Sequence, residues 1–222
     1  MEIRTAFHKA LREIQDEVVV MGNMVEKALL RSVAALKDRD LTKAREVIEG
    51  DLKINDKRYA IEDKCILLIA TQQPMAGDLR AIIGVLNIIT EIERIGDHAE
   101  GIAKIAVLNG DEPPVKPLID IPRMADLVVD MLHQSLDALI TRDAGLAKEI
   151  ADRDDQVDEL YDQVFAELLE LMTKNPAIIT RATRLVWVTH NLERSADRVT
   201  NICERIVYMV TGTMEETNIS NY

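Results

Sequence analysis

Cysteine is scarce in this sequence, since Cys65 and Cys203 are the only two and neither belongs to a CxxC pair. Both fall on apolar stripes, so we interpret them as reduced thiols packed in the core. No apolar run approaches the roughly 20 residues that span a bilayer. The first residues lead straight into an amphipathic pattern, unlike the apolar core of a signal peptide. A cytoplasmic protein is expected, one that meets a membrane only through its partners.

Basic side chains are also in deficit, with 27 Lys and Arg against 39 Asp and Glu and a net charge of -12. A phosphate backbone is bound by clustered Lys and Arg, so nucleic acid is not expected as a partner. The sequence has no Gly-rich phosphate loop, no GxxxxGK[ST] and no nucleophile beside a base. Neither ATP binding nor phosphoryl transfer is therefore expected, and we do not expect an enzyme.

Apolar residues recur at helical spacing through almost the whole chain, and no stretch shows the alternation of a strand. The pattern predicts helices over residues 7–36 and 76–108, with a helix between them that stops before Gln72. After Pro122 it predicts three more, which end near Ile140, Asn175 and Thr211. The breakers between Asn109 and Pro117 form the one clear linker. We therefore predict an all-α fold of six helices, arranged as two tandem antiparallel three-helix bundles joined end to end.

The two halves are copies of one unit. Glu93–Asp97 reads ERIGD and returns one hundred positions later as ERSAD at Glu193–Asp197. An offset of 103 places Asp51 on Asp154 in the second helix of each copy, and Asn55 on Asp158. We expect a first repeat over 1–109, a Pro-rich linker over 110–121, a second repeat over 122–212 and a tail over 213–222.

The repeated positions are mostly acidic, and residues four apart lie on one face of a helix. Like charges at that spacing repel, and a carboxylate beside a packed seam is costly unless something pairs with it. The groove between the second and third helices could bring both pairs of a copy together. Clustered oxygen donors are typical of sites for hard cations such as Fe³⁺, Mg²⁺, Mn²⁺ or Ca²⁺. The candidate metal ligands are Asp51, Asn55, Glu93, Asp97, Asp154, Asp158, Glu193, Asp197 and Asn201.

A simpler interpretation is that these acids form ion pairs on a solvated face with Arg58, Arg94, Arg194 and Arg198. A third interpretation, a di-iron oxidase in a helical bundle, needs a Glu three residues before a His. None of the four histidines, His8, His98, His133 and His190, has a Glu at that position, so we expect surface or satisfied core histidines. The single Trp187, next to the seam residue Val188, is expected in the core or in a groove.

Nearly the whole chain resembles the PhoU family of phosphate-uptake regulators. The likeness is carried by Leu79-Arg80 and by four longer stretches: Met21–Glu26, Val47–Asp51, Thr90–Ala99 and Asn191–Arg198. The resemblance implies two three-helix bundles that carry multinuclear metal clusters on E/DxxxD motifs. These motifs map onto Glu93 and Asp97, Glu193 and Asp197, and Asp154 and Asp158, with Asp51 and Asn55 as a weaker fourth pair.

The resemblance further implies a bacterial negative regulator that links the ATPase subunit of the phosphate ABC transporter, PstB, to the sensor histidine kinase PhoR. Iron, zinc, manganese or magnesium ions are the expected cofactors, and a homodimer is the expected assembly. The alternative is a metal-free helical adaptor whose acids are only structural ion pairs. Three departures predict unequal sites. Asn55 replaces a carboxylate in the first copy, and Gly101 stands where the second copy has Asn201, a candidate oxygen ligand four residues after Asp197. Arg198 stands where the first copy has His98.

Overall fold

The computed structural model describes residues 2–214, with side chains from residue 5 onwards, and all regular structure in that part of the chain is helical. Residues 215–222 of the predicted tail lie outside the described residues. The first copy contains α1 (Glu2–Asp38), α2 (Leu41–Gln72) and α3 (Gly77–Asn109). The second contains α4 (Asp120–Thr141), α5 (Ala144–Ala151), α6 (Asp154–Lys174) and α7 (Ile179–Thr211), with a 3₁₀ turn at Pro176–Ile178.

Local signals in the sequence set the helix ends. Asp40 caps α2 by accepting a hydrogen bond from the backbone N–H of Lys43 at 2.9 Å. At its other end α2 stops at Gln73, which adopts a left-handed conformation immediately before Pro74. α3 stops at Gly110, whose combination of a φ of 59° with a ψ of -139° is easily reached only without a side chain. The predicted ends of the first three helices are therefore accurate to within a few residues, apart from the start of α1.

Two predicted helices differ in detail. α4 begins at Asp120, two residues before Pro122. A proline is tolerated in the first turn, because the backbone N–H groups there have no hydrogen-bond partner within the helix. The predicted fifth helix is divided into α5 and α6. At the break the N–H of Arg153 bonds to the carbonyl oxygen of Ile150, and the N–H of Gln156 to that of Arg153, both at 3.1 Å. These bonds span three residues instead of four, which tightens the chain and interrupts the α-helix.

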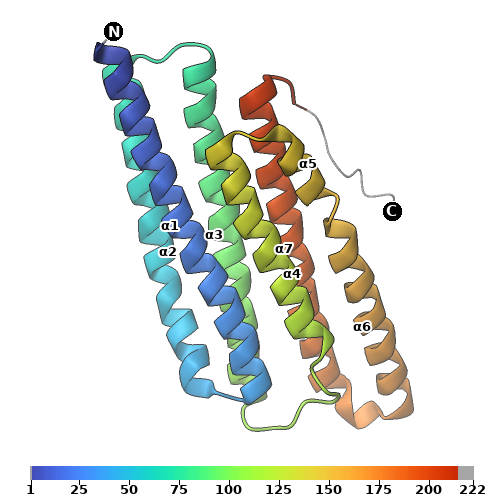
Figure 1. Cartoon of the computed structure of the whole chain (residues 1–222). Helices are drawn as coiled ribbons and strands as arrows, with labels where there is room; N and C mark the ends of the chain where they lie inside the picture. Colours follow the sequence, from blue (N-terminus) through green and yellow to red (C-terminus); the bar gives the residue numbers. More distant parts are fainter. Residues whose placement is uncertain (1, 215–222) are drawn as a thin grey trace.

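The two bundles lie side by side and not end to end, so that part of the prediction is wrong (Figure 1). α3 packs lengthwise and antiparallel against α7, and α1 packs against α4. Close approach is possible because glycines face the neighbouring helix: a methyl group on Gly84 would lie 2.2 Å from Sδ of Met209. The six long helical segments expected from the sequence are present, counting α5 and α6 as one, but the connection between the copies folds back.

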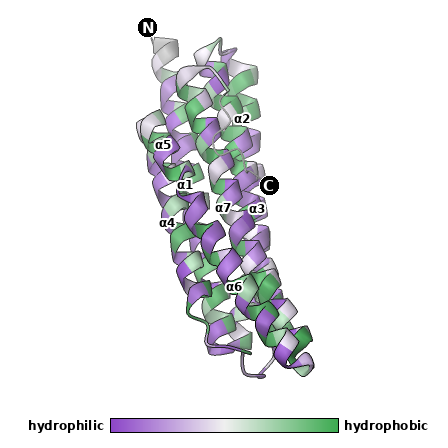
Figure 2. Ribbon diagram, turned by 90° about the vertical axis from the view of Figure 1, so that its right-hand side faces the viewer, coloured by the Kyte–Doolittle hydropathy of each residue, from purple (hydrophilic) through white to green (hydrophobic). Residues whose placement is uncertain are grey.

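One continuous hydrophobic core runs through both bundles. Along each helix polar and apolar residues alternate, as the ribbon coloured by hydropathy shows (Figure 2). Cys65 and Cys203 are buried, unpaired members of this core, as predicted, and burial raises the pKa of each thiol to about 12. Trp187 is 58% exposed, so it does not lie in the core, the first of the two places predicted for it. Within residues 2–214 no helix is long and apolar enough to cross a bilayer.

Candidate metal centre

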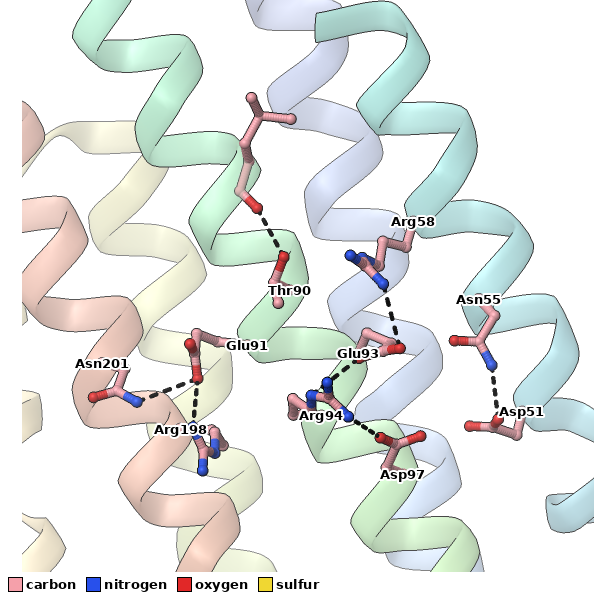
Figure 3. A network of polar contacts seen from close by, with 11 residues as sticks. Asp51, Asn55, Arg58, Thr90, Glu91, Glu93, Arg94, Asp97, Arg198 and Asn201 are labelled. Atoms are coloured by element: carbon pink, nitrogen blue, oxygen red, sulfur yellow. Dashed lines mark hydrogen bonds and ion pairs between the residues drawn. The ribbon is translucent and has the colours of Figure 1, made fainter.

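The acidic pairs of each copy face one another across two helices. In the first copy Asp51 and Asn55 lie on α2, opposite Glu93 and Asp97 on α3 (Figure 3). Gly96 of α3 faces α2 here, and a Cβ on it would lie 3.3 Å from Cδ1 of Ile54 and 3.6 Å from Oδ1 of Asp51. The first distance is tight and the second is an ordinary contact, so the close packing of the two helices at this point is against Ile54.

Arginines and an amide engage most of the first cluster. Nη1 of Arg94 donates to Oδ2 of Asp97 at 3.1 Å, and its Nε lies 3.7 Å from Oε2 of Glu93. Nη1 of Arg58 lies 3.5 Å from Oε1 of Glu93. Asn55 Nδ2 donates to Oδ2 of Asp51 at 2.9 Å (Figure 3). Ion pairing therefore accounts for much of the charge in this copy.

The second cluster is different, because no Lys or Arg of the described chain makes an ion pair with Asp154, Asp158, Glu193 or Asp197. The nearest basic group in contact is His190, whose Nδ1 lies 3.2 Å from Oε2 of Glu193 without the geometry of a hydrogen bond. Asp154 is the first residue of α6 and only 6% exposed. The helix N-terminus offers it partial compensation, but ion pairing does not neutralise the cluster.

Burial and mutual repulsion shift the pKa values of these acids. Burial raises the pKa of Asp154 to about 7, with repulsion from Asp158 and Asp197 adding to the shift. Burial also raises the pKa of Glu193 to about 7, helped by Asp197 and Asp158. In the first copy burial raises the pKa of Asp51, and the hydrogen bond from Asn55 opposes the rise. A cation among these carboxylates would reverse such shifts.

Four buried carboxylate oxygens have no hydrogen-bond partner among the described residues: Oδ1 of Asp51, Oε2 of Glu93, Oδ1 of Asp154 and Oε2 of Glu193. They form two equivalent pairs, one in each repeat. A buried oxygen without a partner costs free energy, and such oxygens are uncommon in folded proteins. The same two positions carry such an oxygen in both copies, although Arg94 lies 3.7 Å from the oxygen of Glu93 and His190 lies 3.2 Å from that of Glu193.

The oxygen atoms of the candidate ligands do not form a coordination sphere in this structure. Within residues 2–214, no three His, Cys, Asp or Glu side chains converge closely enough to hold an ion. Asn201 is turned away, since its Nδ2 donates to Oε2 of Glu91 at 3.2 Å, and Arg198 donates to the same oxygen at 3.3 Å (Figure 3). The donor chemistry suits a hard cation, and small side-chain rotations would have to accompany its binding.

The structure also places two residues beside the candidate ligands that the sequence did not single out. His190 contacts Glu193, and Glu91 binds both Arg198 and Asn201 across the two bundles. His190 precedes Glu193 by three residues, so helical spacing could have revealed it. Glu91 could not be found in this way, because its partners come from the other copy.

The fold and the repeated acids together define an all-α protein of two duplicated three-helix units, each with acidic side chains that face one another from its second and third helices. The PhoU domain matches the chain twice, over residues 18–106 and 121–206. The chain belongs to the PhoU family.

Relatives and solved structures agree with this assignment. The phosphate-specific transport system accessory protein PhoU homolog of Clostridium acetobutylicum is 40% identical over 219 residues, which cover 97% of this chain and 99% of that protein. The homolog of Aquifex aeolicus is 40% identical over 204 residues, 92% of each chain. The crystal structure of PhoU from Pseudomonas aeruginosa superposes with a TM-score of 0.88 at 34% identity, covering 93% of this chain and all of that one.

Proposed function

We propose that this protein is a cytoplasmic negative regulator of phosphate uptake, a metal-binding adaptor between the ATPase subunit of the phosphate transporter (PstB) and the sensor kinase PhoR. Family membership and the names of the relatives, which are phosphate-specific transport system accessory proteins, support a role in regulating phosphate transport. The sequence lacks the loops that hold nucleotides, which supports a non-catalytic role exerted through partners.

The repeated buried oxygens without partners are the observation that carries the metal proposal. In the second copy Asp154, Asp158, Glu193 and Asp197 would hold the ion, with Asn201 joining only if it leaves Glu91. In the first copy Asp51, Asn55, Glu93 and Asp97 would hold a weaker one, because Arg58 and Arg94 already compete for Glu93 and Asp97. A bound cation would supply the positive charge that the second cluster lacks. Iron, zinc, manganese and magnesium are the candidates.

Elemental analysis of the purified protein tests this proposal. We expect the wild type to bind more than one metal ion per chain. The Glu193→Ala/Asp197→Ala variant should lose about half or more of this metal content. The matched control is Asp126→Ala/Asp137→Ala, which removes two exposed carboxylates from α4 and should keep the full metal content. Chelator should lower the melting temperature of the wild type and of the control, and change that of the site variant less.

The alternative is a metal-free helical adaptor, and the arginine contacts of the first copy favour it there. On that hypothesis neither the wild type nor the variant holds metal, and chelator changes nothing. Finding that result would remove the metal from the proposal and leave the adaptor role in place.

The partners and the assembly need separate measurements. Purified PstB and the cytoplasmic part of PhoR should each retain the full chain in a pull-down. Failure of both would leave the regulatory role supported by family membership alone. Analytical ultracentrifugation of the free protein should give the mass of a homodimer, and a monomer at every concentration would contradict that part of the proposal.

A further inference from the structure

The solvent-facing side of α2 carries large apolar side chains at a regular spacing. Leu52, Tyr59 and Ile66 follow one another at seven-residue intervals and are 70%, 57% and 54% exposed. We call these three residues the α2 stripe. Seven residues are almost two helical turns, so the three side chains share one face at steps of about 10.5 Å. Exposed apolar residues in a row of this kind are typical of surfaces that bind another molecule.

The duplication offers an internal control, because α6 performs in the second copy the packing that α2 performs in the first. At an offset of 103, Asp155 and Asp162 stand where the stripe has Leu52 and Tyr59. Asp155 lies in the first turn of α6, where the helix N-terminus favours a carboxylate, whereas Leu52 lies in the interior of α2. Asp162 lies within α6 as Tyr59 lies within α2, so the fold accepts an Asp at that position. The apolar ring of Tyr59 is therefore not required by the packing, and a function specific to the first copy would explain it.

Carboxylates flank the α2 stripe on both sides. At 100° per residue, Asp56 and Asp63 lie on one side of Tyr59 and Glu62 on the other, with Glu49 further along. None of these four makes an ion pair or a hydrogen bond with the described residues. Arg45 lies within the same sector of the helix, and the guanidinium of Arg58 lies over the ring of Tyr59, with Cζ 5.6 Å from the ring centroid. The face therefore combines an apolar centre with a border of four carboxylates and two arginines, so its net charge is negative.

A groove between α1 and α2 lies on the neighbouring flank of α2, with Leu67 about 80° and Lys57 and Lys64 about 140–160° around the helix from Tyr59. Its volume is about 650 Å³, and its apolar walls include Val20, Leu67 and Leu68. Leu67 follows the last stripe residue directly and is itself exposed. The two lysines in the groove, Lys57 and Lys64, both bind Glu17, so they add no free positive charge. An apolar side chain of a partner that lies along α2 could enter here.

We propose that the α2 stripe and the adjoining groove bind a basic amphipathic helix of a partner protein. Such a helix places apolar residues against the stripe and Lys or Arg against the flanking carboxylates. A second copy of this chain fits poorly, because pairing two stripes would bring Asp56, Glu62 and Asp63 of both copies together. Anionic lipid and nucleic acid are repelled by the same charges. The inference takes its biological setting from the proposed adaptor role and does not depend on bound metal.

The test measures binding of a labelled synthetic peptide of about 18 residues, five helical turns of Leu and Lys with Leu on one face, by fluorescence anisotropy in chelator. The full-length variant Leu52→Asp/Tyr59→Asp carries the residues of the second copy and should melt within about 5 °C of the wild type, because both replaced side chains are mostly exposed. We expect its affinity for the peptide to fall by about tenfold or more. Because the variant gains two negative charges, unspecific attraction to a basic peptide would instead become stronger.

The matched control is Leu108→Asp/Ile119→Asp, which adds the same charge at two exposed apolar residues outside α2, and it should bind at least as tightly as the wild type. Neutralising the border with Asp56→Asn/Asp63→Asn should weaken binding several-fold, while Asp126→Asn/Asp137→Asn should not.

Equal affinity of the stripe variant and the control would overturn the proposal. So would conversion of a wild-type dimer into a monomer by Leu52→Asp/Tyr59→Asp, since the stripe would then join two copies. A failed PstB or PhoR pull-down with normal peptide binding would contradict only the proposed function.

Discussion

Asp51 and Asp154 occupy the same place in their repeats but have different neighbours one turn later. Asn55 donates a hydrogen bond to Asp51, whereas the equivalent Asp158 repels Asp154. Burial raises the pKa of both carboxyls, and the neighbour opposes the rise in one copy and adds to it in the other. The Asn-to-Asp difference is therefore one reason, beside the contacts of Arg58 and Arg94 in the first copy, why the negative charge of the second cluster is the less neutralised of the two.

These shifts predict an unusual pH dependence for the metal-free protein. The pKa values of Asp154 and Glu193 are about 7 in the folded state, against about 4 for such groups in an unfolded chain. Between about pH 4 and pH 7 the folded state holds more protons, so the stability that these groups contribute is lost as pH rises. We expect Asp154→Asn/Glu193→Gln to melt about 4–8 °C above the wild type at about pH 8 in chelator.

At about pH 5 both carboxyls of the folded protein are mostly protonated, so the same variant should melt close to the wild type. Thermal melts followed by circular dichroism, at several pH values in chelator, make this comparison. If the variant melted above the wild type by the same amount at every pH, the pKa values of Asp154 and Glu193 would not be raised in the folded protein.

The candidate ligands could be predicted from the sequence because duplication places the same acids at the same helical positions. The side chains that contact these residues and their neighbours could not be predicted in this way. Arg58 reaches Glu93 from a different helix, and Asn201 reaches Glu91 from the other copy. Both contacts depend on helix packing and on side-chain rotamers, which a one-dimensional repeat does not specify.

Among the elements, the division between α5 and α6 shows the limit of periodicity. Ile150 and Val157 are seven residues apart and both buried, so the apolar pattern continues through the break at Arg153 as if one helix were present. Trp187 shows a similar limit, because it lies one residue from the buried Val188 and yet points to solvent. Spacing predicts which residues share a face, but it does not show where a helix tightens or how far a face is covered.

Helix packing predicts opposite effects for the same substitution at two helical glycines. A methyl group on Gly84 would lie 2.2 Å from Sδ and 2.3 Å from Cγ of Met209, at the contact between α3 and α7. We expect the steric overlap in Gly84→Ala to lower the free energy of unfolding by about 1–3 kcal/mol. The higher helix propensity of alanine offsets part of this loss. Gly50 on α2 has nothing within 4 Å of the new methyl group, so Gly50→Ala should raise the free energy of unfolding by about 0.5–1 kcal/mol.

Urea unfolding of the two variants and the wild type measures both effects with one method. The Gly50 variant serves as the control for propensity, since it changes the helix without changing a contact. If both variants gained stability equally, Met209 would move aside freely and the α3–α7 contact would not be tightly packed.

Across the whole molecule, α3 and α7 run antiparallel, and the start of each lies beside the end of the other. Nη1 of Arg184, near the start of α7, donates to the carbonyl oxygen of Leu108 at the end of α3 at 2.8 Å. Arg80, near the start of α3, lies over the ring of Tyr208 close to the end of α7. Between these ends the side chains of His98 and Ser195 lie 3.1 Å apart in the buried interface. The side-by-side arrangement depends on these contacts between distant residues, so the local patterns of the sequence could not reveal it.

This interface predicts that the two copies stabilise each other. A protease site inserted between Glu112 and Pro113 would allow the linker to be cut in the folded protein. We expect the cut halves to elute together and to melt in one transition within about 5 °C of the intact chain, because their shared apolar core stays buried.

Expressed separately, residues 1–112 and 113–222 would each expose the side that α3 and α7 bury against one another. Each should aggregate or melt at lower temperature, and mixing should restore the joint transition. A separate half that is monomeric and melts like the intact protein would show instead that each repeat folds alone and that the two merely touch.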